Sequence, residues 1–432
     1  MKKNLLKAFM FAVLGVFSMN TFAQESDIED AIVAVVSNKW IPQDGTTYKG
    51  DVKGVPTFVC GDPSGKDITY VTSPEFNLIT PSIKVRYTIE ANTDDDWKND
   101  VATEVRFNYV NTSGEPAEYR EVCTENIPKD GKITIDKTFE VPADWQEGTE
   151  VRTTVSVGAK AGNIVTKENL SVTAPVLYIS EMSTENTEKI EWNEGKKIRL
   201  GIFRKFTNEK WYTLCLPFEM TQEIAETAFG AGTQIKVFGD VTEVYNAKGI
   251  MKKATFNFYN PTFTEGTGYP YLIKVGDDKV DNPQFNGVVV SKTVQEPYVT
   301  ADGSGNLYTF MGNLDRKHYM VTEGSMHILQ DNKILQCTDD DITMFKGLRG
   351  WFHFVEAPNT NFPKDIDPSS SASVHDFSFA VYDEFYSNIN SVTTQNVKKE
   401  GIYNMAGQKV NAVRNEFQKG FYIINGEKVY VK

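Results

Sequence analysis

The 432-residue sequence predicts an all-β protein with an N-terminal β-sandwich, a second β-rich domain with one short helix, and a small C-terminal β-hairpin segment. Three observations predict this fold class. Hydrophobic residues recur at every second position in many short segments, clusters of turn-forming residues separate those segments, and one segment alone has the pattern of a helix. Segments with this alternation form antiparallel strands that bury one face and expose the other to water.

The N-terminus has the features of a secretory signal peptide. Lys2, Lys3 and Lys7 come before or at the start of an apolar run over residues 8–17, and a small-residue cleavage site ends at Ala23. This order of basic, apolar and small residues predicts export and cleavage after Ala23. The apolar run is too short to cross a bilayer, which takes about 20 residues. The alternative is a short buried helix.

Residues 24–182 are expected to form the β-sandwich. The alternation is clearest over residues 83–90, 105–109 and 151–157, where apolar and polar side chains take turns. Clusters of turn-forming residues separate the predicted strands, at residues 92–96, 111–116, 128–131 and 143–148. Many short strands with regular turns and hardly any helical periodicity are typical of a sandwich.

One segment of this domain resembles a known family. Val71–Leu78 reads Val-Thr-Ser-Pro-Glu-Phe-Asn-Leu, which is similar to the Ser-Pro-x-hydrophobic-Asn-Leu opening of galactose-binding-like jelly rolls in bacterial surface adhesins. Trp145, ahead of Val151, matches the loop Trp that packs those sandwiches. The resemblance implies a jelly-roll-like sandwich that binds a ligand. The family's closing Trp-x-x-Asp segment is absent, so no ligand residue is carried over.

A polar segment separates this domain from the next. Residues 183–197 are charged and have no strand pattern, which predicts an interdomain linker. The second domain is expected over residues 198–387. Its single predicted helix has Thr221 as N-cap, Glu223 in the first turn, and Gly230 directly after its end. Predicted strands lie at residues 211–218, 255–259, 269–275, 287–290, 308–311 and 346–352.

Four motifs occur in order along the second domain. They are Trp-x-Thr-Leu-Cys-Leu-Pro-Phe at 211–218, Phe-Gly-x-Gly at 229–232, Gly-x-Pro-Tyr-Leu-Ile-Lys at 268–274 and Gly-x-Arg-Gly-x-Phe at 347–352. This set resembles a β-rich module that recurs in large Bacteroidota surface proteins. The resemblance implies a surface location and brings no established activity with it.

The C-terminal segment contains the strongest hairpin signal. Residues 388–400 are a polar tether, and residues 401–432 form a tail in which Asn425-Gly426 lies between two apolar runs. A type I′ turn needs φ > 0 at both central residues, which favours this dipeptide. A second turn signal, Ala406-Gly407, follows the first apolar run of the tail.

The tail also resembles a sorting signal. Its Ile-Tyr-Asn, Gly-Gln-x-Val and Lys-Gly-x-Tyr motifs and its final Lys432 are similar to the C-terminal sorting segment of secreted Bacteroidota proteins. The resemblance implies that export machinery recognises the tail and then removes it or keeps it as an anchor attachment point. The alternative is a structural hairpin that packs on the second domain.

The charge balance excludes two classes of partner. Without the first 23 residues the chain has 42 basic and 58 acidic residues, a net charge of −16. Nucleic acid and anionic membranes require a clustered positive field, so neither is an expected partner. No segment after the signal peptide is apolar enough to predict a membrane span in the mature chain.

The four cysteines leave two interpretations open. Cys60 and Cys123 lie in the first domain and Cys215 and Cys337 in the second, which allows one disulfide per domain in an oxidising compartment. We prefer four buried thiols, because many domains of this size have cores large enough to need no cross-link. Cys-x-x-Cys does not occur, which argues against zinc-ribbon and thioredoxin-type sites.

The sequence shows no recognisable catalytic constellation. His318, His327, His353 and His375 include no i, i+4 pair, and Gly-x-Ser-x-Gly, a Gly-rich phosphate loop and a papain-like Cys are absent. We therefore expect a non-enzymatic protein. The alternative is a secreted hydrolase, or an accessory subunit of a polysaccharide- or peptide-degrading system, which would need two facing carboxylates in a cleft.

The sequence offers one candidate for a glycan-binding loop, the acidic segment made by Asp94, Asp95, Asp96 and Trp97. Trp97 would stack on a sugar ring while the carboxylates accept its hydroxyls, or the acids would bind Ca²⁺. The alternative is a solvated acidic turn. Asp339–Asp341 is a second Ca²⁺ candidate, although consecutive residues of an extended segment point in alternate directions. No other cofactor is expected.

These features together predict an exported protein of the cell surface or extracellular space. We expect an adhesin-like, non-enzymatic module that binds a glycan or a partner protein through loops at one end of its sandwich.

Overall fold

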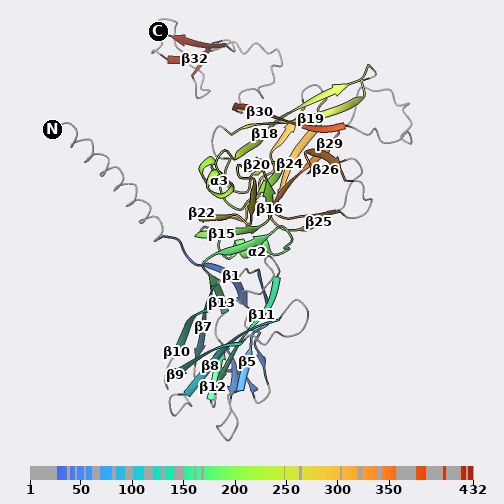
Figure 1. The fold of residues 1–432 in the computed structure, drawn as a ribbon. Coiled ribbons are helices and arrows are strands. Elements are labelled where there is room, and N and C mark those ends of the chain that lie inside the picture. Colours follow the sequence, from blue (N-terminus) through green and yellow to red (C-terminus); the bar gives the residue numbers. More distant parts are fainter. Residues whose placement is uncertain are drawn as a thin grey trace, which may run out of the picture. The chain divides into compact units, whose positions relative to one another are not determined.

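The structure is a computed structural model whose contacts divide the chain into two compact units, Met1–Tyr386 and Ser387–Lys432 (Figure 1). The residues that it describes are 27–36, 39–43, 46–52, 55–60, 69–79, 84–92, 101–110, 120–127, 132–140, 150–159, 162–166, 170–247, 249–261, 265–301, 304–319, 325–337, 343–356, 376–385, 402–404, 420–424 and 427–431. The prediction of an all-β fold is confirmed, because strands dominate both units.

The N-terminal part of the first unit is a β-sandwich of two sheets (Figure 1). The seven-stranded sheet has the order β1-β13-β7-β12-β4-β3, with β10 also paired to β7. Its strands are β1 (Ala31–Val36), β3 (Thr47–Val52), β4 (Val55–Cys60), β7 (Lys84–Asn92), β10 (Lys132–Glu140), β12 (Gly162–Thr166) and β13 (Leu170–Ala174).

The six-stranded sheet has the order β2-β5-β11-β8-β9, with β6 also paired to β11. Its strands are β2 (Ile41–Pro42), β5 (Thr69–Thr72), β6 (Phe76–Ile79), β8 (Val101–Val110), β9 (Arg120–Ile127) and β11 (Glu150–Ala159). Apolar side chains from both sheets belong to one buried cluster, which the alternation predicts. On β11, for example, Val155 and Val157 are buried and Arg152 is exposed.

The Ser-Pro motif interrupts one strand of this sheet. β5 and β6 pair with successive halves of β11, and Ser73 lies between them. The Ser73 N–H donates to the Val155 carbonyl at 2.8 Å, and the Val155 N–H donates to the Ser73 hydroxyl oxygen at 3.0 Å. The buried Ser73 side chain therefore keeps β11 hydrogen-bonded beside Pro74, which has no N–H of its own.

After the sandwich strands, the described residues up to Phe385 form five more sheets, which we assign to the second domain. One sheet has three strands in the order β14 (Leu177–Ser180), β15 (Lys197–Phe203) and β22 (Gln284–Val289). Two further sheets have two strands each. One pairs β16 (Lys205–Thr207) with β21 (Lys279–Asp281), and the other pairs β25 (Lys317–Tyr319) with β28 (Thr343–Phe345). One five-stranded sheet comprises β17 (Tyr212–Cys215), β20 (Pro270–Lys274), β18 (Gln234–Tyr245), β19 (Met251–Asn260) and β30 (Asp376–Phe385). The other comprises β23 (Tyr298–Thr300), β24 (Leu307–Asn313), β29 (Arg349–Val355), β26 (Met326–Gln330) and β27 (Lys333–Gln336).

Phenylalanine rings join the two five-stranded sheets. Phe256 of β19 packs against Phe352 of β29 with ring centroids 4.5 Å apart. Phe258, also on β19, lies edge-on to Phe310 of β24 at 5.5 Å. All four rings are buried, and each contributes about 1.5–3 kcal/mol through the area removed from water. The period-two spacing of Phe256 and Phe258 places both on this inner face.

Helix α3 (Gln222–Phe229) forms where the sequence predicts it. The Ile224 N–H donates to the Thr221 hydroxyl oxygen at 3.1 Å, which satisfies one of the unpaired donors of the first turn. Gly230 follows with φ = 96°, a conformation that an L side chain rarely adopts, and ends the helix.

The predicted linker, residues 183–197, contains a helix that the sequence did not predict. Helix α2 (Asn186–Glu191) lies there, so the described residues contain two helices rather than the one expected. The fully buried Asn186 side chain donates to the carbonyls of Ser180 and Leu314 and accepts from the Ser180 N–H. Polar composition predicted a loop, whereas these polar groups are buried because each has a hydrogen-bond partner.

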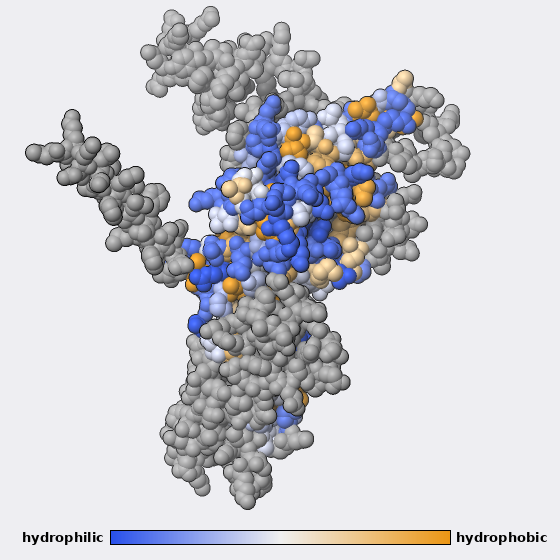
Figure 2. Space-filling view, in the orientation of Figure 1, coloured by the Kyte–Doolittle hydropathy of each residue, from blue (hydrophilic) through white to orange (hydrophobic). Residues whose placement is uncertain are grey.

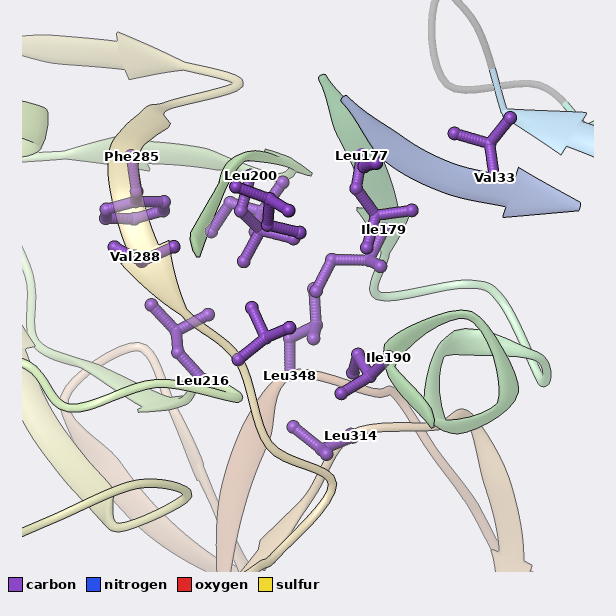
Figure 3. Packing of buried hydrophobic residues seen from close by; sticks show 14 of the residues in the cluster. Val33, Leu177, Ile179, Ile190, Leu200, Leu216, Phe285, Val288, Leu314 and Leu348 are labelled. Carbon is purple, nitrogen blue, oxygen red and sulfur yellow. The ribbon is translucent and has the colours of Figure 1, made fainter. Parts of the chain in front are cut away.

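The sandwich and the second domain share one buried cluster (Figure 3). Figure 3 shows Val33 of β1 near the strand β14, which carries Leu177 and Ile179, and shows Ile190 of α2 pointing toward Leu348. The two predicted domains thus form a single compact unit.

The second unit is a three-stranded antiparallel sheet of β31 (Ile402–Asn404), β32 (Gly420–Ile424) and β33 (Glu427–Val431). Ile424 pairs with Glu427, which confirms the predicted hairpin across Asn425-Gly426. The two turn signals themselves lie outside the described residues. In the part of the chain that the structure describes, no helix has the length and apolar character needed to cross a membrane.

Candidate functional site

The predicted ligand residues lie outside the described part of the chain. Asp94, Asp95, Asp96 and Trp97 fall in the connection between β7 and β8, and Asp339–Asp341 follow β27. The predicted cleavage site at Ala23 is also outside it. No group of three His, Cys, Asp or Glu side chains that could hold a metal ion occurs among the residues with described positions.

Cysteines of the second domain form no bridge with each other. Cys215 is a buried free thiol on β17, and its Sγ donates to the Gly268 carbonyl at 3.4 Å. Burial raises the pKa of this thiol to about 12, so it stays protonated at neutral pH. Cys60 lies on β4 and Cys123 on β9, in opposite sheets of the sandwich.

A pocket of about 980 Å³ opens in the second domain. Its walls come from the β16–β17 turn, the β26–β27 hairpin and the strands β28 and β29. We call it the basic pocket and define it by the lining residues Arg204, Lys210, Trp211, Tyr212, Lys346 and Arg349. The sequence predicted none of these residues to bind a ligand.

The β26–β27 hairpin fixes one wall. Its two-residue turn, Asp331-Asn332, has φ angles of 46° and 58°, as a type I′ turn requires. Lys210 forms a 3.1 Å ion pair with Asp331, and the Trp211 N–H donates to the Asn332 side-chain oxygen at 2.7 Å. The turn before β17 and the turn after β26 are thereby linked, although more than a hundred residues separate them.

Behind the pocket, the carboxylate of Glu181 contacts three positively charged side chains. The Arg349 guanidinium donates to Glu181 through Nη2 at 2.6 Å and through Nε at 3.1 Å. Lys346 Nζ donates to Glu181 at 2.8 Å, and Arg204 Nε lies 3.5 Å from the same carboxylate. The cluster of Arg204, Lys346, Arg349 and Glu181 therefore has an excess of positive charge.

Glu181 is ionised in this cluster. Burial alone would raise the pKa of its carboxyl, but the charges of Arg349 and Arg204 and the hydrogen bonds from Lys346 and Arg349 hold that pKa below its usual value. An ionised, ion-paired carboxylate accepts hydrogen bonds and is a poor general acid.

Arg204 forms the floor of the pocket. Its Nη1 donates to the carbonyls of Thr213 at 2.8 Å and Leu348 at 2.9 Å, and the guanidinium lies 4.7 Å from the centroid of the Phe206 ring. Its side chain is only 2% exposed. Burial, followed by the nearby charge of Arg349, lowers its pKa, but an arginine starts so high that it remains charged.

A strained residue supports this floor. Leu348 is buried and has φ = 57°, a region that costs a non-glycine residue about 1–2 kcal/mol. Its carbonyl accepts from Arg204 Nη1 and from the Cys215 N–H at 3.3 Å. This conformation points the carbonyl at Arg204. The strained backbone of Leu348 therefore supplies an acceptor that holds the guanidinium in place.

Aromatic rings form the remaining wall. Trp211 and Tyr212 are half-buried, while Phe345 and Trp351 are buried behind the opening. Lys210 Nζ lies 5.8 Å from the centroid of the Tyr212 ring. A surface with planar rings and charged donors can stack on an apolar face of a ligand and hydrogen-bond its polar edge.

Sequence reasoning missed this site because its residues were assigned to structure. Trp211 and Arg349 belong to the quoted motifs, where they were treated as strand residues. Arg204, which directly follows the buried apolar end of β15 at Ile202 and Phe203, was the available signal, because arginine is rarely fully buried without a partner.

No protein-family model and no curated protein matches this sequence. Solved structures with detectable similarity include carbohydrate-binding modules. The CBM22-1–GH10 modules of Clostridium thermocellum endo-1,4-β-D-xylanase 10B, complexed with xylohexaose, are 14% identical over 34% of this chain and 28% of that chain, with a TM-score of 0.25. The chain thus spans under a third of that relative.

Two isolated modules are covered almost completely. The CBM22-1 xylan-binding domain of Paenibacillus barcinonensis Xyn10C is 9% identical over 34% of this chain and 96% of that domain, with a TM-score of 0.20. A CBM28 module specific for non-crystalline cellulose is 12% identical over 34% of this chain and 92% of its own, with a TM-score of 0.22. At these levels the similarity concerns the β-sandwich fold alone, and no ligand is carried over.

Proposed function

We propose that this chain is an exported, non-enzymatic binding protein that recognises a glycan in the basic pocket of its second domain. The observation that carries the proposal is the juxtaposition of half-buried Trp211 and Tyr212 with the charged donors of Lys346 and Arg349 in one pocket of about 980 Å³. Saccharides have apolar ring faces and polar edges, and this lining offers a counterpart to both.

The charge state of the pocket supports binding rather than hydrolysis. A glycosidase needs one protonated carboxyl and one ionised carboxylate on either side of the bond. Glu181 has a lowered pKa and three cationic partners, and Asp331 is paired with Lys210. Glu181 is therefore not suited to donate a proton at neutral pH.

The face of the second domain that Figure 2 shows is mostly polar. In the face shown in Figure 2, hydrophilic residues predominate on the described part of the second domain, and hydrophobic ones occur as small separate patches. Large exposed apolar patches favour protein docking, whereas a polar surface with a lined pocket favours a small polar ligand.

Export is part of the proposal. The basic, apolar and small-residue order that ends at Ala23 and the sorting-like motifs of residues 401–432 support a location at the cell surface or outside the cell. Partners would then be a glycan and the export machinery.

A panel of neutral and acidic plant and host glycans, immobilised and probed with the purified full chain, tests the proposal. We expect specific binding that weakens about tenfold or more in Trp211→Ala, because a buried aromatic contact carries a large share of binding energy. Tyr298→Ala is the matched control, since Tyr298 is 70% exposed and lies outside the pocket.

Three results would contradict the proposal or its site assignment. Equal loss of binding in both variants would show that Trp211 has no special role. Loss in Trp97→Ala with full binding in Trp211→Ala would move the site to the predicted acidic loop of the sandwich. If the protein bound none of the glycans in the panel, the proposal of glycan binding itself would be overturned.

A further inference from the structure

The basic pocket has a charge opposite to that of the chain. Five cations line it, namely Arg204, Lys205, Lys210, Lys346 and Arg349. The acidic lining residues are Glu209 and Asp331, and Asp331 is paired with Lys210. Even with Glu181 counted, positive charge exceeds negative charge here, whereas the whole chain has a net charge of −13. A concave site of one sign concentrates ligands of the other sign.

A buried donor at the floor has no partner. Arg204 Nη2 is inaccessible to water, and in the described part of the chain no acceptor lies within hydrogen-bond reach of it. A buried guanidinium normally has its donors satisfied, because each unsatisfied charged donor costs free energy. The Asn313 side-chain oxygen, also in the lining, is likewise buried without a donor among the described residues.

Further donors lie closer to the opening. Lys346 is 45% and Arg349 33% exposed, so both can reach a ligand while they hold Glu181. The Arg349 bonds to Glu181 use Nε and Nη2, which leaves its Nη1 for another acceptor. A planar guanidinium with a neighbouring ammonium is a common arrangement for carboxylate and sulfate groups.

We infer that the basic pocket selects acidic saccharides, and that the carboxylate or sulfate group of the sugar binds between Lys346 and Arg349 above Arg204. This inference rests on the proposed function and adds the class of ligand. The sugar ring would lie against Trp211, and its anionic group would offset the excess charge of the cluster. An acidic peptide could satisfy the same cations, but it would make little use of the aromatic wall.

The test measures affinity by calorimetry with the purified full chain and four probes, an oligogalacturonate, a chondroitin sulfate oligosaccharide, neutral xylohexaose and an aspartate-rich peptide. We expect at least one acidic saccharide to bind about tenfold more tightly than xylohexaose, with an affinity that falls as NaCl is raised. The two acidic saccharides distinguish a carboxylate ligand from a sulfate ligand.

Lys346→Gln is the decisive variant, because Lys346 is exposed enough to be replaced while Glu181 keeps both arginines. We expect about tenfold weaker binding of the acidic probe and no change for a neutral one, since the lost contact is a charge-assisted hydrogen bond. Lys252→Gln, the same change at an exposed lysine on β19, should leave both affinities unchanged.

Other outcomes are equally informative. Tight binding of neutral xylohexaose with no effect of Lys346→Gln would overturn the selectivity for acidic sugars and leave glycan binding intact. Binding of an aspartate-rich peptide, but of no saccharide, with loss in Lys346→Gln would overturn both the saccharide class and the proposed function. Equal effects of Lys346→Gln and Lys252→Gln would show that the pocket has no special role.

Discussion

Glu181 is the residue on which the basic pocket depends. It lies between Arg204, Lys346 and Arg349, and its side chain is only 14% exposed. We predict that Glu181→Gln lowers the free energy of unfolding by about 3–5 kcal/mol, because removing one partner of a buried ionic cluster leaves the remaining charges uncompensated. Denaturation by guanidinium chloride at pH 7 measures this loss, and exposed Glu209→Gln should change the stability by less than about 0.5 kcal/mol.

The same residue makes the stability depend on pH in a defined direction. Because the folded protein lowers the pKa of Glu181 below 4.5, its contribution is complete above pH 4.5 and is lost as the pH falls through the lower, folded value. The difference in stability between the wild type and Glu181→Gln should therefore shrink between neutral pH and pH 3. A difference that stays constant over this range would show that the cluster does not depend on the ionised carboxylate.

At the scale of an element, β29 supplies one wall of the pocket through Arg349, Gly350 and Trp351. Gly350 pairs with Gly312 of β24, and a Cβ atom on Gly350 would lie 2.5 Å from the Phe310 ring. We predict that Gly350→Ala destabilises the protein by about 1–3 kcal/mol, because the ring must move within a packed core. Thermal unfolding monitored by circular dichroism measures the change.

A double-mutant cycle identifies the cause. Phe310→Leu removes the atoms that the new methyl group would meet, so Gly350→Ala should cost clearly less in the Phe310→Leu background than in the wild type. Costs that simply add would contradict the steric explanation and would point to an effect on the backbone of β29.

Local signals explain which elements the sequence revealed. Helix α3 was predictable because its cap, Thr221, and its terminating glycine lie next to it in the chain. Helix α2 was not, because it is stabilised by Asn186, whose amide bonds the carbonyl of Leu314, 128 residues away. Alternation identified the strands well, since each strand records its own buried face.

The basic pocket was hidden for the same reason as α2. Its residues come from β16, β17, the β26–β27 hairpin and β29, and nothing local marks Arg204 and Arg349 as neighbours. The motif that contains Arg349 was visible, but its pairing with Glu181, 168 residues earlier, follows from the register of distant strands. The acidic loop at Asp94–Trp97 stays a prediction that the described residues do not test.

At the scale of the molecule, the sandwich and the second domain share a core, so they should unfold together. The buried Asn193 accepts from the Ile32 N–H at 2.8 Å and donates to the Ile32 carbonyl at 2.6 Å, so its amide continues the hydrogen bonding of β1. Its amide also donates to the Lys189 carbonyl at 2.8 Å, which ties β1 to the end of α2.

We predict that Asn193→Ala uncouples the two parts, because it leaves both backbone groups of Ile32 without their partner at a cost of about 1–3 kcal/mol each. Hydrogen exchange followed by mass spectrometry across a denaturant series gives an opening free energy for each strand. In the wild type, peptides of β13 and β24 should share one value. In Asn193→Ala the value for β1 and β13 should fall below that of β24. Asn208→Ala, which removes a hydrogen bond to Asp278 within the second domain, should keep them equal. Separate values in the wild type would show that the shared cluster does not couple the sandwich to the second domain.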